Sequence, residues 1–217
     1  PTLDKIVTNS KAKWIQINPI CDMIQFTPTP LIKNNALPEE ELIHIIKEAH
    51  KQGLKVYLEP FSWPLHHNQG EKWWRAYEVQ WRPIMLYYAA LAQKQKVEML
   101  SFHPGCPLWG VSVEDAPFID LLFTELLKDV RKIYKGLICI EFTRAHPDMQ
   151  MFRKGDFLGG YLWGSPDRIK RKNPSMKEIL SGVGYELDQW YYGAHVRYGK
   201  PFIMNQISAC SFNGFLT

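Results

Sequence analysis

Residues 49–60 read AHKQGLKVYLEP and contain the pattern on which the fold depends. The end of an amphipathic helix is followed by Gly53, then by a short apolar run that ends in Glu59 before Pro60. Glycine commonly follows the last turn of a helix, and a short apolar run between turn residues is typical of a buried strand. The stretch therefore predicts a helix that leads into a strand with a carboxylate at its end.

The same alternation of helix and strand recurs along the chain. Helical patterns lie at residues 38–52, 74–95, 117–134 and 187–198, and strand patterns at 14–18, 54–59, 99–103, 137–142, 157–163 and 202–206. Strands that alternate with helices in this way pair in parallel through right-handed crossovers. We therefore predict an α/β fold, a TIM-type barrel with six recognisable strands, in one domain that spans residues 1–217.

Composition is consistent with a globular domain that has a sizeable core. The chain has 217 residues, of which 46% are hydrophobic and 22% charged, a short length for a complete eight-stranded barrel. The net charge is +4, and the only basic run, residues 168–172, has no accompanying aromatic ladder, so we favour a solvated loop over a nucleic-acid site. No apolar stretch is long enough to cross a bilayer, so we expect a soluble chain without a membrane partner.

The cysteine pattern and the amino terminus do not decide the compartment. The four cysteines lack close-pair spacing, which favours reduced core thiols, and the first residues do not resemble a signal peptide. Both a cytoplasmic protein and an exported one whose signal peptide has been removed fit this pattern. The sequence does not indicate an oligomeric state.

Two carboxylates stand at the ends of predicted strands. Glu59 and Glu141 would share one rim, because the carboxyl ends of parallel barrel strands meet there, so they are the candidate pair for acid and base roles. The alternative, which we favour for the pair acting together, is that each side chain holds an arginine or a loop amide.

Aromatic and amide side chains follow the same strand ends. Rings on one rim are what a saccharide groove requires, because the C–H faces of sugars stack on them. The candidate ligand-binding residues are Trp63, His103, Trp109, Tyr161, Trp163, Asn205 and Gln206. Core packing is the alternative, and for Trp73 and Trp74, inside a helical pattern, the two roles are equally favoured. His66, His67 and His103 lack the spacing of a metal site, so we predict neither a metal nor a cofactor.

Four segments resemble the glycoside hydrolase clan of (β/α)8 barrels, and they are most similar to family 113, which is β-mannanase-like. They are residues 12–17 (AKWIQI), 49–60, 130–136 (VRKIYKG) and 199–201 (GKP). The resemblance covers nearly the whole chain, although the first and eighth barrel strands have no counterpart. It implies a shortened barrel that binds an oligo- or polysaccharide, with a β-linked mannan or glucan as the expected ligand.

The resemblance also implies that both catalytic carboxylates of the family are replaced. The family acid/base lies in a Gly-x-Glu-Leu turn after strand four, and residues 105–108 (GCPL) place Pro107 there, next to Cys106. The family nucleophile follows Gly-Lys-Pro by a few residues, where Gln206 stands. Neither proline nor an amide can perform the chemistry of a retaining glycosidase.

These replacements favour a glycoside-hydrolase-like pseudoenzyme, without hydrolysis through the family positions. Two alternatives stay open. The first is a non-catalytic sugar-binding or scaffold protein, and the second is an active glycosidase whose carboxylates have moved to Glu59 and Glu141.

Overall fold

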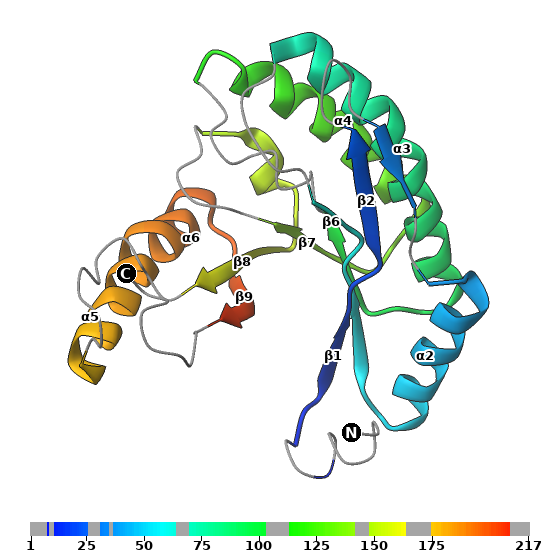
Figure 1. The fold of residues 1–217 in the computed structure, drawn as a ribbon, viewed down its shortest axis with the longest axis horizontal. Helices are drawn as coiled ribbons and strands as arrows, with labels where there is room; N and C mark the ends of the chain where they lie inside the picture. Colours follow the sequence, from blue (N-terminus) through cyan, green and yellow to red (C-terminus); the bar gives the residue numbers. More distant parts are fainter. Residues whose placement is uncertain are drawn as a thin grey trace.

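The larger sheet is a curled layer of six parallel strands (Figure 1). The structure is a computed structural model that describes residues 8, 11–25, 31–34, 37–63, 70–102, 113–141, 148–163 and 175–208. The strands, in spatial order, are β1 (Trp14–Ile17), β4 (Lys55–Leu58), β6 (Met99–Phe102), β7 (Leu137–Glu141), β8 (Phe157–Trp163) and β9 (Phe202–Ser208). The predicted order and parallel pairing are confirmed. Within the described ranges β1 and β9 each pair with one strand of this sheet, so it is an open part of a TIM-type barrel.

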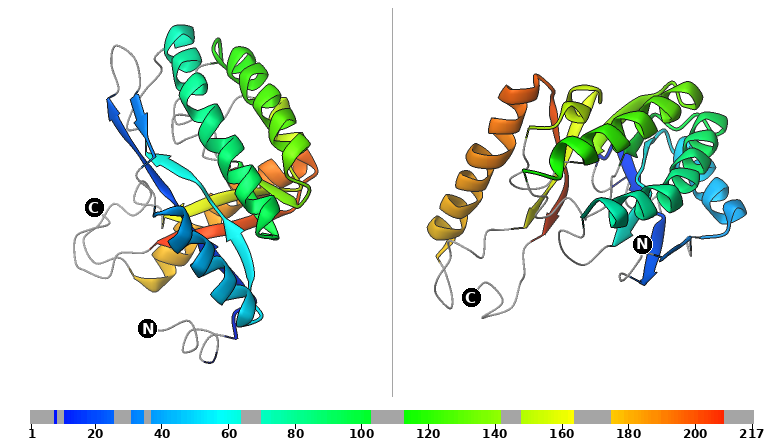
Figure 2. Two further views of the ribbon diagram at one scale, coloured as in Figure 1. Left: turned by 90° about the vertical axis from the view of Figure 1, so that its right-hand side faces the viewer. Right: turned by 90° about the horizontal axis from the view of Figure 1, so that it is seen from above.

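The helices lie along the outside of this curve, as the two views of Figure 2 show. They are α2 (Glu39–Lys51), α3 (Gly70–Lys94), α4 (Ala116–Ile133), α5 (Met176–Glu186) and α6 (Gly193–Tyr198), with a 3-10 turn η2 (Gln150–Arg153) and a π-helical segment η3 (Leu187–Tyr192). No helix in the described part of the chain is long and apolar enough to span a bilayer.

Local sequence explains where helix α2 begins and ends. Three glutamates occupy its first turn, where they complement the positive end of the helix dipole, and Gly53 follows its end at φ 73°. Its buried residues Leu42, Ile46 and Ala49 are spaced four and three apart, so they form one stripe against the sheet.

The main core lies between the helices and the convex face of the sheet. Outward-facing strand residues such as Leu58, Leu100 and Ile140 are fully buried there. In the helices, the ring of Trp74 contacts those of Trp73, Tyr77 and Phe123 edge to face, with ring centroids 5.2–6.1 Å apart. Trp73 and Trp74 are therefore core residues, and the sugar-stacking alternative for them is wrong.

A second, three-stranded sheet was not predicted. It consists of β2 (Ile20–Gln25), β3 (Leu31–Lys33) and β5 (Phe61–Trp63), in the order β3-β2-β5. Strands β2 and β5 continue the chain direction of β1 and β4 beyond Pro19 and Pro60. Prolines lack the N–H that a ladder needs, so the barrel sheet ends there and a new pairing begins. Strands β3 and β5 have only three residues each, which is too short for a periodic pattern to be recognised from sequence.

The predicted helix at residues 187–198 begins earlier than expected. Helix α5 begins at Met176 with a capping box, in which the Ser175 hydroxyl accepts from the Glu178 amide and the Glu178 carboxylate accepts from the Ser175 amide. Gly182 and Gly184 weaken the helical pattern that follows, which hides the helix from a propensity argument. The cap itself is a recognisable sequence signal.

Asp156 lies directly before β8 and anchors the amino end of the sheet. Its Oδ2 accepts from the Ile138 amide at 2.8 Å and from Arg131 Nη2 at 2.5 Å. Burial favours a raised pKa for Asp156, but these two hydrogen bonds and the Arg131 charge outweigh burial and lower the pKa below its ordinary value of 3.8.

Replacing Asp156→Asn should therefore destabilise the protein at neutral pH by roughly 1 kcal/mol. A lowered pKa means that the stabilisation is present above pH 3.8 and is lost as the pH falls through the folded-state pKa. Urea unfolding at pH 7 and pH 3 measures this, and the difference from the natural protein should shrink at pH 3. Asp188→Asn, at an exposed position of η3, is the control and should change little at either pH.

Candidate functional site

The concave face of the sheet is divided into an apolar layer and a polar layer. The first layer includes Trp14, Met99, Leu137 and Phe157, which begin their strands, and the ring of Tyr57 in β4, whose hydroxyl reaches the second layer. The residues of the second, polar layer follow those of the first by two or four positions, in or directly after the same strand, because alternate residues of a strand face the same side. The polar layer therefore lies toward the carboxyl ends of the strands, and its members are Gln16, Asn18, Glu59, Ser101, Cys139, Glu141 and Tyr161.

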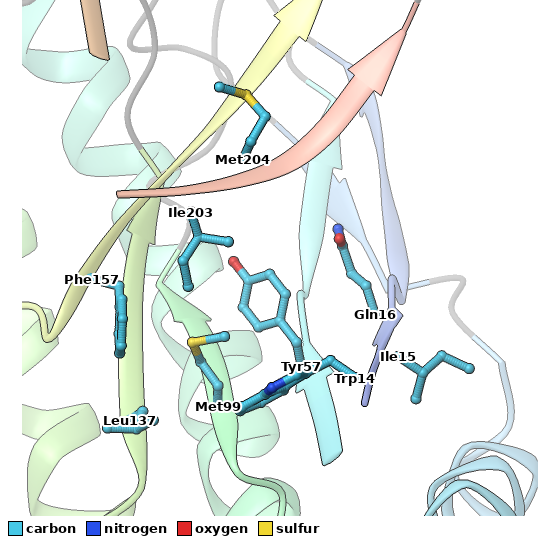
Figure 3. Close-up of a pocket in the computed structure, with 9 residues that line it drawn as sticks. All are labelled: Trp14, Ile15, Gln16, Tyr57, Met99, Leu137, Phe157, Ile203 and Met204. Carbon is cyan, nitrogen blue, oxygen red and sulfur yellow. The ribbon is translucent and has the colours of Figure 1, made fainter. Parts of the chain in front are cut away.

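The apolar layer borders an open cavity of about 500 Å³ (Figure 3). The Gln16 amide and the Tyr57 hydroxyl lie toward one end of this cavity, and Leu137 lies at the other. The volume is in the range of ligand pockets. The cavity is lined by Trp14, Ile15, Gln16, Tyr57, Met99, Leu137, Phe157, Ile203 and Met204.

Glu59 follows β4 directly and is fully buried. Its Oε2 accepts hydrogen bonds from the amide nitrogens of Gln16 and Asn18, the latter at 2.7 Å, and its Oε1 accepts from the Tyr161 hydroxyl at 2.8 Å. Burial raises the pKa of Glu59, and the three hydrogen bonds only partly offset this effect. The carboxylate thus links β1 to β8 across the concave face.

Glu141 is the last residue of β7 and is 1% exposed. Its Oε1 accepts from the hydroxyls of Tyr57 and Ser101, the latter at 3.2 Å. Tyr57 lies within the influence of both carboxylates, because burial, Glu141, Cys139 and Glu59 together raise the pKa of its phenol. Burial and the Glu141 charge likewise raise the pKa of the Cys139 thiol. Both groups are therefore neutral at physiological pH.

Gly159 leaves the room that Glu141 occupies. A Cβ atom at position 159 would lie 2.7 Å from Glu141 Oε1 and 2.8 Å from Cys139 Sγ, which is closer than such atoms approach. Gly159 pairs with Glu141 in the β7–β8 ladder, so the missing side chain and the buried carboxylate are neighbours on adjacent strands. The glycine is thus a condition for the position of Glu141.

The structure places only part of the predicted site. Glu59, Glu141 and Tyr161 come together on the concave face, and hydroxyl and amide groups of described residues donate hydrogen bonds to the two carboxylates. Three of the other predicted residues, His103, Pro107 and Trp109, lie outside the described residues.

The remaining predicted residues are placed by their backbone alone, since their side chains lie outside the described part. Trp63 ends β5 and Trp163 ends β8. Gln206 pairs with Tyr161, and Asn205 is the additional residue of a β-bulge, because Met204 pairs with Gly160 one step earlier. The bulge brings position 206 opposite the tyrosine that contacts Glu59.

Sequence analysis missed four residues of the polar layer, namely Gln16, Asn18, Ser101 and Cys139. Each lies two residues, or a multiple of two, from another inward-facing residue of the same strand, so strand alternation could have identified them. Among the described residues, no group of three or more His, Cys, Asp and Glu side chains is placed to hold a metal ion.

Comparison with known families and structures supports a relationship to sugar-processing enzymes. The profile of Glycoside Hydrolase Family 113 matches residues 2–215. A complex of a family-113 β-1,4-mannanase has a TM-score of 0.69 and 19% identity over 99% of this chain and 67% of its own chain. The β-mannanase AaManA from Alicyclobacillus acidocaldarius gives 0.68 and 16%, over 97% of this chain and 66% of its own.

More distant structures share the fold. A fungal β-1,4-galactanase has a TM-score of 0.63 and 14% identity, over 99% of this chain and 68% of its own. The chain therefore spans about two thirds of the length of the structures it resembles. No curated protein gives a significant match.

The crowding around Glu141 leads to a prediction for Gly159→Ala. The added methyl group must displace the carboxylate or the Cys139 thiol, which should destabilise the protein by about 1–3 kcal/mol in chemical unfolding. Gly184→Ala is the control, because nothing lies within 4 Å of a Cβ at that position of α5. The control should be neutral or stabilising by up to about 1 kcal/mol. Equal effects of the two substitutions would contradict the close packing described here.

The raised pKa of Glu59 leads to a prediction of pH dependence. A raised pKa means that the folded state binds the proton more tightly than the unfolded state, so the contribution of Glu59 to stability falls as the pH rises from about 4.5 through its folded-state pKa. Glu59→Gln removes this titration. Urea unfolding between pH 4 and pH 8 should show the substitution to be most damaging at the acidic end, and an unchanged difference across this range would disprove the shift.

Proposed function

Because the chain belongs to glycoside hydrolase family 113, we propose that it binds a β-linked polysaccharide of the mannan or glucan type. The groove would lie at the carboxyl ends of the barrel strands, where parallel barrels carry their sites. The observation that carries the proposal is the polar layer of Glu59, Glu141 and their hydroxyl and amide partners above an apolar cavity. Sugars need such a combination of hydrogen-bonding groups and apolar surface.

We propose further that the chain does not hydrolyse its ligand through the positions used by the family. The family resemblance implies that Pro107 and Gln206 stand at these positions, and neither residue can transfer a proton or form a glycosyl ester. Loss of general acid/base catalysis alone commonly lowers a rate by a factor of about 10² to 10⁴. The proposed activity is thus binding.

One observation favours the second candidate, an active glycosidase that uses Glu59 and Glu141. Burial raises the pKa of Glu59, as is typical of a general acid. Against it, both oxygens of Glu59 already accept hydrogen bonds from protein groups, and two hydroxyls donate to one oxygen of Glu141. A carboxylate in such a network acts first as an acceptor that positions its neighbours.

Calorimetric titration with mannohexaose and cellohexaose tests the proposal, together with chromatography of the same mixtures after prolonged incubation. We expect binding of at least one oligomer without release of shorter sugars. Trp63→Ala and Trp163→Ala should each weaken binding about tenfold, which corresponds to a loss of roughly 1.4 kcal/mol of binding free energy. Tyr192→Ala, at an exposed aromatic position of η3 that does not line the cavity, is the matched control, and it should leave the affinity nearly unchanged.

The alternatives give different outcomes in this experiment. No binding of either oligomer would reject the proposed function. Turnover that disappears in Glu59→Gln or Glu141→Gln would establish the relocated catalytic pair instead.

A further inference from the structure

Two amide side chains share one oxygen of the buried carboxylate. Gln16 lies on β1 and Asn18 follows that strand, two positions apart, and the amide nitrogens of both donate to Glu59 Oε2. Since both nitrogens contact a single oxygen atom, the two amides are adjacent. Asn18 is exposed and Gln16 is half-buried, whereas Glu59 beneath them is fully buried.

The carboxylate determines which way each amide points. If either amide were turned over, its oxygen would face the Glu59 oxygen, and two acceptors would oppose each other without a proton between them. With the nitrogens held at Glu59, each amide directs its carbonyl oxygen and its second N–H elsewhere. Within the described part of the chain, neither side chain makes another hydrogen bond.

We propose that the Gln16 and Asn18 amides bind adjacent hydroxyl groups of a neutral sugar, with Glu59 as the residue that positions them. This inference rests on the proposed function and names the side chains and ligand class. Each amide offers one acceptor and one donor, and each hydroxyl of a vicinal pair needs the same two partners. Gln16 also lines the cavity, so a sugar held there would reach apolar surface as well (Figure 3).

Charge determines which sugars the two amides accept. Among the described residues, no Lys, Arg or His forms an ion pair with Glu59, whose three partners are neutral. A sugar carboxylate near the amides would be repelled by Glu59 without a compensating cation. The site should therefore accept neutral sugars and exclude uronates.

The ligand experiment compares two oligomers with the same backbone. Mannohexaose and the β-1,4-linked hexamer of mannuronate differ only in the oxidation state of C6, so they differ in charge. Calorimetry at low ionic strength should give at least tenfold weaker binding for the mannuronate oligomer. Equal affinities would overturn the charge selectivity.

The side-chain experiment uses Asn18→Ala and Gln16→Ala. Each substitution should weaken mannohexaose binding roughly fivefold, because a single hydrogen bond to a neutral group is lost. Lys13→Ala, an exposed change at the residue before β1, is the matched control and should leave affinity unchanged. Circular dichroism and thermal melting verify that all three variants fold, and Asn18, being exposed, tolerates truncation best.

Glu59→Gln tests the positioning role. The new side chain has one acceptor oxygen in place of two and carries no charge, so its hydrogen bonds hold Gln16 and Asn18 more weakly, and affinity should fall although residue 59 is buried. Affinity of the natural protein should also decrease as the pH falls from 8 to 4, and that dependence should vanish in Glu59→Gln. The other titratable groups in or next to the polar layer are Tyr57, Cys139, Glu141 and Tyr161, and Glu141→Gln, as the second acidic group, should keep the pH dependence.

The outcomes distinguish the role of the two amides from the proposed sugar-binding function. If mannohexaose binds but Asn18→Ala and Gln16→Ala bind it as tightly as the natural protein does, the proposed amides are wrong and the sugar-binding function stands. If no neutral oligosaccharide binds, both are rejected.

Discussion

The hydrogen bonds of Glu59 are the interaction on which the concave side of the molecule depends. A carboxylate that is removed from water without partners destabilises a protein by several kcal/mol, so its donors are required. They come from β1, from the residue after it and from β8. The curvature of the sheet must therefore bring strands that are not neighbours within hydrogen-bonding distance, and the position of every group in the polar layer follows from this.

The two ends of the concave face differ in chemical character. At the amino ends of the strands, apolar side chains leave a cavity, whereas toward the carboxyl ends the side chains are carboxylates, hydroxyls and amides. Gly159 belongs to the same arrangement, because the absence of a side chain at this position leaves the space that the Glu141 carboxylate occupies.

Sequence patterns predicted the barrel because each of its six strands is a short apolar run between turn residues. They found Glu59 and Glu141 because both end such runs. Gln16 and Asn18 were missed because amides at a strand end resemble ordinary surface residues until Glu59 is placed beside them. The bulge at Asn205 could not be predicted, because it depends on the register with β8. Strands β2 and β5 were missed because pairing, rather than composition, defines them.

The bond between Tyr161 and Glu59 joins residues that are 102 positions apart in the sequence. Contacts over such separations form late, since the closure of a long loop must precede them. Strands β1 and β4 can pair while Glu59 is still hydrated, and the carboxylate loses its water only when β8 arrives with the tyrosine. The burial of this charge thus belongs to a late stage of folding, and a chain arrested before β8 docks would expose a hydrated acid beside the amides of Gln16 and Asn18.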